Sequence, residues 1–192
     1  MQPEHLTQHE LLAVLKQAKA ESPRDYCLIL MGYKHGLRSV ELANLTLDDI
    51  KDGCVNIKRA KQSMETNQPM TAHRGEPLLD EIKALRRWLK ARKDDGSKAL
   101  FNSQMGGNMS REQIHRIYKG VATRAGIPAG KKRAVHVLKH SRASHLVGKM
   151  DLAELRQTMG HVNVQSTLIY AHVSDKAASK AAHAAEMEAF RR

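Results

Sequence analysis

Helix-start and helix-stop signals recur along most of this 192-residue sequence, whereas the alternation typical of a β-strand occurs in one stretch alone. Thr7 with Glu10, and Ser110 with Gln113, have the spacing of a capping box, in which two side chains satisfy free backbone amides of the first turn. Gly36 stands where a left-handed residue commonly closes a helix. A chain of this length built from short helices can bury a core without disulfides or metals.

The apolar spacing predicts several helices joined by short connections. Their expected ranges are residues 8–19, 24–35, 39–45, 77–93, 110–125, 137–147, 151–159 and an alanine-rich tail at 174–192. Ser39 is expected to cap the third helix. The side chains predicted to face the core from the fourth helix are Leu79, Ile82, Leu85 and Leu89. Because no linker or internal repeat interrupts the pattern, residues 1–173 are predicted to form one domain, with 174–192 as a helical tail.

A single stretch between the third and fourth helices alternates like a β-strand. A tight turn at Asp52-Gly53 is followed by a strand that runs toward Lys61. The polar run at 62–68 is expected to be a hairpin loop, and residues 69–72 the returning strand. The sequence therefore predicts a mainly α fold of the α+β type, a helical bundle with a small three-stranded antiparallel sheet at one edge.

The composition indicates a polyanionic partner. The chain carries 32 Lys and Arg residues against 20 Asp and Glu residues, a formal net charge of +12. Aromatic residues make up only 4%, which argues against a stacking platform for single strands and favours duplex DNA. The sequence has no membrane-length apolar run and no signal-peptide core, so a cytoplasmic protein is expected. Cys27 and Cys54 lie in apolar contexts and predict buried free thiols.

The stretch from His136 to Tyr170 offers histidines, a cation and a lone tyrosine, which suit an attack on a phosphodiester without a metal. A covalent route needs a nucleophile, cations on the nonbridging oxygens, a proton acceptor and a proton donor. The side chains of the matching types are, in that order, Tyr170, Arg38 with Lys139, His136 or His161, and Lys61.

Other basic side chains are candidates for contacts with DNA phosphates. They are Lys58 and Arg59 in the hairpin, Lys131, Lys132 and Arg133 in a GKKR loop, and Arg142. A further basic set on the 110–125 helix is explained as well by a solvated face as by DNA contact: Arg111, Arg116, Lys119 and Arg124.

Three stretches of this sequence resemble the motif blocks of the tyrosine recombinase (phage integrase) family, and they occur in the same order as in the family. They are GLRSVELANLTLDDI (36–50), HVLKHSRASHL (136–146) and MGHVNVQSTLIYAHV (159–173). The resemblance covers nearly the whole chain as a catalytic domain. The small fimbrial phase-variation invertases, which largely lack a separate core-binding domain, further resemble RDYCLILMGYKHGLRSVEL (24–42) and KRAKQSMETNQPM (58–70).

The resemblance implies site-specific DNA strand exchange through a 3′-phosphotyrosyl intermediate and a Holliday junction, without metal or energy cofactor. The implied roles are Arg38 and Lys139 as phosphate clamps, Glu41 as support, Lys61 as general acid, His136 in proton transfer, His161 in phosphate hydrogen bonding, and Tyr170 as nucleophile. Its implied partners are double-stranded DNA, sister subunits in a tetramer on that DNA, and accessory DNA-bending proteins. When free, such a chain is expected to be a monomer or weak oligomer.

One position departs from the family pattern. The second block of the family has His-x-x-Arg, whereas His136 is followed here by Lys139. Arginine holds two phosphate oxygens in a fixed fork and lysine is a mobile point charge, so the loss could cost roughly 2–4 kcal/mol in the transition state. Arg142 lies about 60° further around the helix and is not expected to compensate. This departure keeps one alternative open, a DNA-binding accessory protein with weakened catalysis. A second alternative is a type IB topoisomerase-like nicking and religating enzyme, which would act as a monomer and which assembly on DNA would distinguish.

Three further alternatives concern single groups. His136, His140 and His145 could suggest a metal site, but no well-spaced carboxylate or cysteine completes it, and His140 and His145 are predicted to be packing residues. Lys58 and Arg59 compete for the general-acid role, for which the resemblance favours Lys61. The tail at 174–192 either packs on its own domain or docks in trans on a neighbouring subunit, and the second is our hypothesis.

Overall fold

The computed structural model describes residues 3–59, 64–171, 183 and 186–187. Lys61 and nearly all of the tail at 174–192 lie outside these ranges, so the predictions made for them stay predictions. Within the described part of the chain, no helix is both long enough and apolar enough to cross a lipid bilayer.

The helices predicted between residues 8 and 159 are present, with small shifts at their ends. In chain order the described α-helices are α1 (Gln8–Glu21), α2 (Pro23–Lys34), α3 (Ser39–Asn44), α4 (Glu81–Ala91), α5 (Arg111–Arg124), α6 (Val137–Leu146), α7 (Leu152–Met159) and α8 (Gln165–Leu168). Short 3₁₀ turns are η1 (Leu47–Asp49), η2 (Pro77–Leu79) and η3 (Lys131–Arg133). Both capping boxes are confirmed. The backbone N–H of Glu10 donates to Thr7 Oγ1 at 3.1 Å, and that of Gln113 donates to Ser110 Oγ at 3.2 Å.

The predicted three-stranded antiparallel sheet is confirmed, with its strands in chain order: β1 (Ile50–Lys51), β2 (Cys54–Ile57) and β3 (Thr66–Pro69). The predicted return strand at 69–72 is wrong, because β3 already begins at Thr66, which pairs with Ile57. The polar residues 66–68, which lie in the predicted hairpin loop, pair with β2 instead. Thr66 is buried and Gln68 Nε2 donates to the carbonyl of Thr158 at 2.8 Å, so these polar side chains find partners inside the fold.

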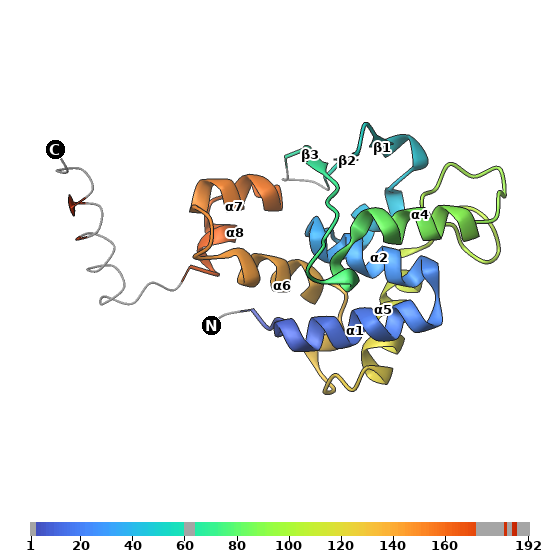
Figure 1. The fold of residues 1–192 in the computed structure, drawn as a ribbon, viewed down its shortest axis with the longest axis horizontal. Helices are drawn as coiled ribbons and strands as arrows, with labels where there is room; N and C mark the ends of the chain where they lie inside the picture. The colour runs from blue at the N-terminus through green and yellow to red at the C-terminus, as the bar shows by residue number, and fades with distance from the viewer. Residues whose placement is uncertain (1–2, 60–63, 172–182, 184–185, 188–192) are drawn as a thin grey trace.

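Helix α2 is central to the larger hydrophobic core and packs against α1, α4 and α6 (Figure 1). Residues 26–33 are all buried. Gly36 follows with φ of 57°, which confirms the predicted left-handed end. A Cβ at Gly36 would lie 2.7 Å from Met159 Cε, so glycine lets the end of α7 approach the junction between α2 and α3 closely.

The start of α3 differs from the prediction. Ser39 is the first helical residue and Arg38 occupies the N-cap position. The carboxylate of Glu41 accepts the backbone N–H of Arg38 at 2.9 Å. A glutamate in the first turn therefore supplies the cap that we expected from the serine hydroxyl, and this fixes Arg38 at an ordered turn.

The inward face of α4 is rotated from the predicted one. Leu85 is buried as predicted, but Leu89 is 40% exposed, and Trp88 takes its place in the core. In the first turn of α4, Glu81 is itself buried and paired with the ring of His35, the residue that follows α2. The inward face of α4 therefore includes a polar contact that apolar spacing does not predict.

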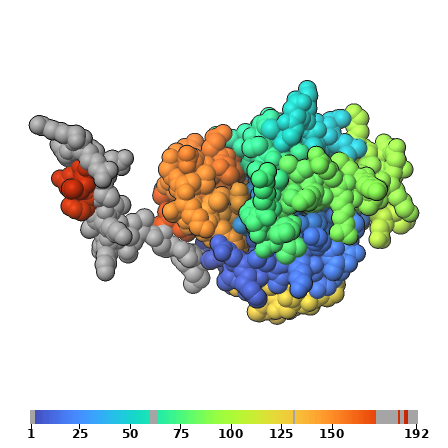
Figure 2. All heavy atoms as spheres, viewed as in Figure 1, coloured from blue at the N-terminus to red at the C-terminus, as the bar shows by residue number. Residues whose placement is uncertain are grey.

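Helices α6, α7 and α8 form one end of the molecule, where Figure 2 shows them as a continuous orange surface. They share a second, smaller hydrophobic cluster made of Ala143, Leu155, Met159 and Tyr170. This packing brings the end of α8 against α6. The sequence stretch that carries the predicted chemistry is thereby folded back on itself.

Candidate active site

Five of the predicted catalytic side chains line one cavity of about 500 Å³: Arg38, His136, Lys139, His161 and Tyr170. They come from separate parts of the chain. Arg38 precedes α3, His136 and Lys139 lie at the start of α6, and the other two follow α7 and α8. The sixth, Lys61, lies outside the described residues. Residues more than a hundred positions apart in the sequence therefore line the same cavity.

Arg38 is held toward this cavity by Glu41. Arg38 Nη1 donates to Glu41 Oε1 at 2.9 Å, and the same carboxylate caps the helix that follows. Glu41 is buried, whereas the side chain of Arg38 is partly exposed. The geometry fits the predicted supporting role of Glu41, because a buried carboxylate paired with a guanidinium fixes the direction in which that guanidinium points.

Arg59 occupies a different place from the one expected of a DNA contact. Its side chain is 0% exposed, and Nη1 donates to Glu41 Oε2 at 3.2 Å. Nη1 also donates to the carbonyl of Gly36, and Nη2 to those of His35 and Thr158. Burial lowers the pKa of this guanidinium. Arg59 therefore ties the end of β2 to the α2–α3 junction and to α7, and sequence reasoning had no signal for this inward direction.

Lys139 has its ammonium group engaged with the backbone. Nζ donates to the carbonyls of Gly36 at 2.9 Å and Met159 at 2.8 Å, and the residue is only 6% exposed. Burial, followed by the charges of Arg59 and Arg38, lowers the pKa of Lys139 to about 7. An arginine at this position would keep its charge at any physiological pH, whereas this lysine titrates near neutrality.

Arg142 does not take over from Lys139. Its guanidinium lies over the ring of Tyr33, 5.6 Å from the ring centroid. It lines a separate cavity of about 360 Å³ together with Lys34 and Gln157. The expectation that Arg142 would not compensate agrees with this geometry, because the side chain lies on a different face of α6 from the catalytic cavity.

The buried His161 is fixed by a neighbouring threonine. Its Nδ1 lies 3.0 Å from the hydroxyl of Thr167 on α8. Burial, followed by the charges of Lys139 and Arg38, lowers the pKa of His161 to about 4, so the ring is neutral at pH 7. The carbonyl of Thr167 also accepts the backbone N–H of Tyr170 at 3.1 Å. One residue of α8 thus holds both His161 and the segment that carries the tyrosine.

Tyr170 is 4% exposed, and its hydroxyl lies 2.5 Å from Nδ1 of His140. Burial raises the pKa of Tyr170 to about 12, and burial lowers that of His140 to about 4. His140 packs in the fold as predicted, and its hydrogen bond to the tyrosine is a contact that the sequence did not predict. His145 also packs, and its ring nitrogens meet the hydroxyl of Tyr33 at 3.0 Å and the carbonyl of Leu6 at 2.8 Å.

A second open cavity of about 620 Å³ adjoins the catalytic one through His136. Arg111, His115 and Lys119 line it from α5. Arg124, further along the helix, is instead paired with Glu21. The basic face of α5 is therefore divided, and its first half opens beside the catalytic residues.

The other predicted DNA contacts are distributed unevenly. The side chain of Lys58 is 79% exposed, with Nζ 3.6 Å from a carboxylate oxygen of Asp49. Lys132 donates to Glu10 at 2.8 Å, and Arg133 donates to the carbonyl of Ile127. The side chain of Lys131 lies outside the described part. Lys58 is the most accessible of these cations, whereas Lys132 and Arg133 have partners within the fold.

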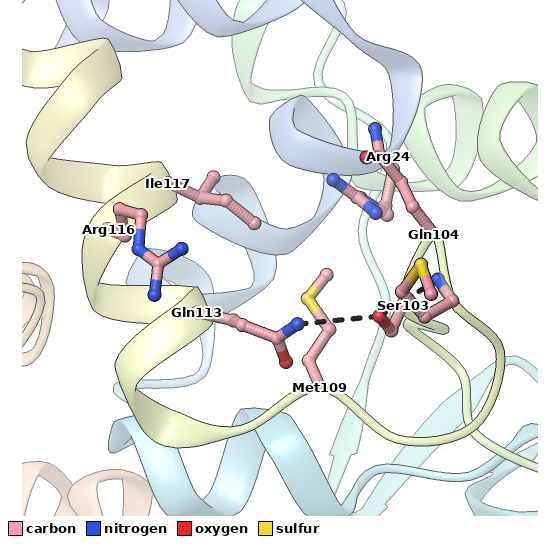
Figure 3. A pocket seen from close by; sticks show the side chains of 8 residues that line it. Arg24, Ser103, Gln104, Met109, Gln113, Arg116 and Ile117 are labelled. Carbon is pink, nitrogen blue, oxygen red and sulfur yellow. Dashed lines mark hydrogen bonds between the residues drawn. The ribbon is translucent and has the colours of Figure 1, made fainter.

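A further cavity of about 270 Å³ lies between α2, α5 and the loop before α5 (Figure 3). Arg24 and Arg116 line it, and Gln113 Nε2 donates to Ser103 Oγ at 3.4 Å across one side. It shares no lining residue with the catalytic cavity. None of the predicted catalytic residues of the described ranges opens into it.

Comparisons with known proteins agree with this geometry. Residues 4–177 match the model of the Phage integrase family. The chain is 33% identical over 177 residues to the type 1 fimbriae regulatory protein FimE of Escherichia coli K12, covering 86% of this chain and 84% of FimE. The crystal structure of XerA recombinase is similar with a TM-score of 0.73 and 25% identity over 100% of this chain. The structure of XerH bound to its difH substrate has a TM-score of 0.73 and 24% identity over 94% of this chain. This chain spans 65% and 54% of those two solved chains.

Proposed function

We propose a residue-by-residue mechanism for this chain, which belongs to the phage integrase family and is a tyrosine site-specific recombinase. The family and the fold expected from the sequence are thereby confirmed. In the proposed mechanism, Tyr170 cuts a DNA strand and holds it as a 3′-phosphotyrosyl ester, and exchange of two strand pairs passes through a Holliday junction. The observation that carries the proposal is the position of the Tyr170 hydroxyl in one cavity with Arg38, Lys139 and His161.

The scissile phosphate is proposed to bind between Arg38, Lys139 and His161. Arg38 is oriented by Glu41 and lines the cavity in which the phosphate is proposed to bind. The neutral ring of His161 is held at Nδ1 by Thr167, which leaves Nε2 for a phosphate oxygen. Donors fixed before the reaction stabilise the charge that develops on the nonbridging oxygens, and each such donor can contribute about a hundredfold or more to the rate.

The chemical steps follow from the nucleophile and the leaving group. The Tyr170 oxygen attacks phosphorus, the bond to the 5′ oxygen breaks, and that oxygen needs a proton in order to leave. Lys61 is proposed as the donor, on the hairpin between β2 and β3, and His136 assists proton transfer. The ester retains the energy of the broken bond, so a second DNA strand can attack it without an energy cofactor.

Duplex DNA is the proposed substrate, and the basic half of α5 is its proposed path beside the catalytic cavity. Arg111 and Lys119 line that half, and Lys58 carries an accessible charge near the sheet. Backbone contacts of this kind make binding fall steeply with salt. The structure of the Tn1549 transposon integrase, which is similar to this chain with a TM-score of 0.75 and 24% identity, was solved in complex with circular intermediate DNA, which supports DNA as the substrate.

Assembly is proposed as a tetramer on DNA in the cytoplasm, with the tail at 174–192 docking in trans and accessory DNA-bending proteins as further partners. The similarity to recombinases favours strand exchange over the nicking and binding-only alternatives. A chain that ends at residue 173 is expected to bind DNA and to lose cooperative assembly on it in gel-shift titrations. Unchanged cooperativity would refute the trans docking of the tail.

Covalent capture of DNA tests the proposed nucleophile. Nicked duplexes with a randomised central sequence are incubated with the chain, and DNA that stays attached after denaturation is amplified and selected again. We expect an adduct with the wild-type chain and none with Tyr170→Phe, which lacks only the attacking oxygen. Tyr26→Phe is the matched control, because it removes another tyrosine hydroxyl, one that donates to the carbonyl of Leu78 at 3.0 Å. An adduct with Tyr170→Phe, or none with wild type, contradicts the proposal.

A further inference from the structure

The contact between Tyr170 and His140 gives the nucleophile a partner that the family resemblance did not assign. We propose that His140 is a catalytic residue that accepts the proton of the Tyr170 hydroxyl as its oxygen attacks the phosphate. This inference rests on the proposed function, in which Tyr170 is the nucleophile. It gives the base role, which the sequence left between His136 and His161, to a third histidine.

The first support is geometric. The Tyr170 hydroxyl oxygen lies 2.5 Å from His140 Nδ1, within hydrogen-bonding distance for a proton transfer. The two ring centroids are 5.9 Å apart and tilted by 44°. Both residues line the same cavity as Arg38 and His161. The hydroxyl is therefore held by His140 at the place where the phosphate is proposed to bind.

The direction of the hydrogen bond follows from protonation. Burial raises the pKa of Tyr170 to about 12, so at neutral pH its hydroxyl carries a proton to donate. Burial, followed by the neighbouring charges of His136 and Lys139, lowers the pKa of His140 to about 4, so its ring is neutral. A neutral imidazole that accepts at Nδ1 carries its proton on Nε2. His140 then has a lone pair directed at the tyrosine proton.

The scaffold keeps these two groups in place. His140 lies on α6, and its backbone N–H donates to the carbonyl of His136. Tyr170 follows α8, where its backbone N–H donates to Thr167, and its ring packs in the cluster with Ala143. A base on a helix, facing a nucleophile fixed by a turn, needs little reorganisation before it reacts.

His136 stands in a different relation to the nucleophile. Its ring meets the ring of His140 nearly at right angles, with centroids 5.4 Å apart, and the residue is exposed. The ring of Tyr170 is paired with His140. Within the described part of the chain, His140 is thus the histidine in hydrogen-bonding contact with the tyrosine oxygen.

The proposed step balances in atoms and protons. The O–H bond of Tyr170 breaks and its proton moves to His140 Nδ1, while a bond forms between the tyrosine oxygen and phosphorus. The bond from phosphorus to the 5′ oxygen breaks, and that oxygen takes a proton from the general acid, proposed as Lys61. His140 is left as an imidazolium and returns its proton to Tyr170 when a 5′ hydroxyl of a second strand reverses the step.

A pH profile of this step involves all titratable groups that face His140. They are His136 and Lys139 on α6, His5 before α1, His161 after α7 and Tyr170 after α8. Between pH 5 and 7 the imidazoles of His140 and His161 stay neutral, whereas Lys139 is charged at pH 5 and loses about half of its charge by pH 7. Variants at His140 retain the other titratable groups. The ratio of the variant rate to the wild-type rate at each pH therefore reports the contribution of His140 alone.

The free chain provides the first test. Long-range proton–nitrogen NMR spectra, with the His140 signals assigned through His140→Asn, are expected to show a neutral ring with its proton on Nε2 at pH 6. Tyr170→Phe is expected to shift the Nδ1 resonance because the donated hydrogen bond is lost. The proposed direction of proton transfer is overturned if the proton lies on Nδ1, or if the Nδ1 chemical shift is the same in Tyr170→Phe as in wild type.

Covalent capture provides the second test, on duplexes selected with the wild-type chain. His140→Asn keeps an acceptor near the position of Nδ1 but is a very weak base. We expect its adduct to form about a hundredfold or more slowly, with a rate that rises about tenfold per pH unit between pH 5 and 7 as phenolate replaces the lost base. The wild-type rate is expected to change by no more than about twofold over that range, through the loss of charge on Lys139 near pH 7. His140→Leu, which lacks the acceptor as well, is expected to be slower still.

A duplex with sulfur in place of the cleaved 5′ oxygen separates the acid from the base, since a thiolate leaves without a proton. On this sulfur-containing duplex, His140→Asn is expected to remain slower than wild type. If the variant instead recovers the wild-type rate, His140 protonates the leaving group and the proposal is overturned. Equal rates for His140→Asn and wild type at every pH also overturn it, while leaving the proposed function intact. No adduct with wild type overturns the proposed function and the role of His140 together.

Discussion

Replacement of Lys139 by arginine is expected to remove a pH dependence that the lysine imposes on this site. Lys139 Nζ is buried between the carbonyls of Gly36 and Met159, and burial with nearby arginines lowers its pKa to about 7. A phosphate clamp has to carry its charge. In the free chain, Lys139 carries that charge below pH 7 and loses it as the pH rises through 7.

The size of the effect follows from this pKa. One pH unit above 7, a free chain has to protonate Lys139 before the anion binds, which costs about 1.4 kcal/mol, or a factor of ten. Two units above, the cost is about 2.7 kcal/mol, or a factor of a hundred. The bound phosphate raises the pKa of Lys139, so the loss is expected in kcat/KM at lower pH than in kcat.

The assay is the initial rate of adduct formation at limiting DNA from pH 6 to pH 9. Wild type is expected to fall tenfold per unit above pH 7, whereas Lys139→Arg stays level because a guanidinium remains charged. Lys139→Met controls for side-chain length without charge and is expected to be slow and level. If wild type and Lys139→Arg share one pH profile, the reasoning from burial to pKa to phosphate binding fails.

Two further predictions concern stability and are checked by urea denaturation. Arg59→Met is expected to lower the free energy of unfolding by roughly 3–5 kcal/mol, because it removes the fully buried cation from Glu41 and one hydrogen bond from each of three carbonyls, and the exposed Lys58→Met should change it by less than about 0.5 kcal/mol. Equal midpoints for the two would contradict the structural role of Arg59. Gly160→Ala, at φ of 65° with its Cβ 2.7 Å from Arg59 Nε, is expected to cost roughly 1–3 kcal/mol more than Gly53→Ala, which has φ of 75° and open space. If Gly160→Ala and Gly53→Ala lower the free energy of unfolding equally, the contact between residue 160 and Arg59 is relieved without cost, and the prediction is wrong.

The residues whose geometry depends on local sequence were predictable. The capping box at Thr7 and the left-handed Gly36 are determined by a few neighbouring residues, so the pattern alone identified them. The order of the motif blocks brought Arg38 and Tyr170 together, since the resemblance carries the long-range packing of a known fold. Their roles at the site remain proposals.

Contacts that depend on packing between distant segments were missed. His140 meets Tyr170 because α8 folds back on α6, and no spacing within either segment encodes that approach. Arg59 is buried because Glu41 and three carbonyls surround it, whereas a hairpin arginine read alone suggests a surface charge. Thr66 lies in a strand because its polar neighbours are satisfied inside. In each case a polar group found its partner in the interior, which hydrophobic periodicity does not register.

Thr167 has a consequence for how the site can be switched. Its hydroxyl holds His161, and its carbonyl holds the backbone of Tyr170. A displacement of the four-residue helix α8 therefore cannot withdraw the nucleophile and leave the histidine anchored. The two are lost or gained in one event. A molecule in which α8 is displaced would therefore lack the nucleophile and the His161 side of the phosphate site together, whereas Arg38 and Lys139 are held by contacts outside α8.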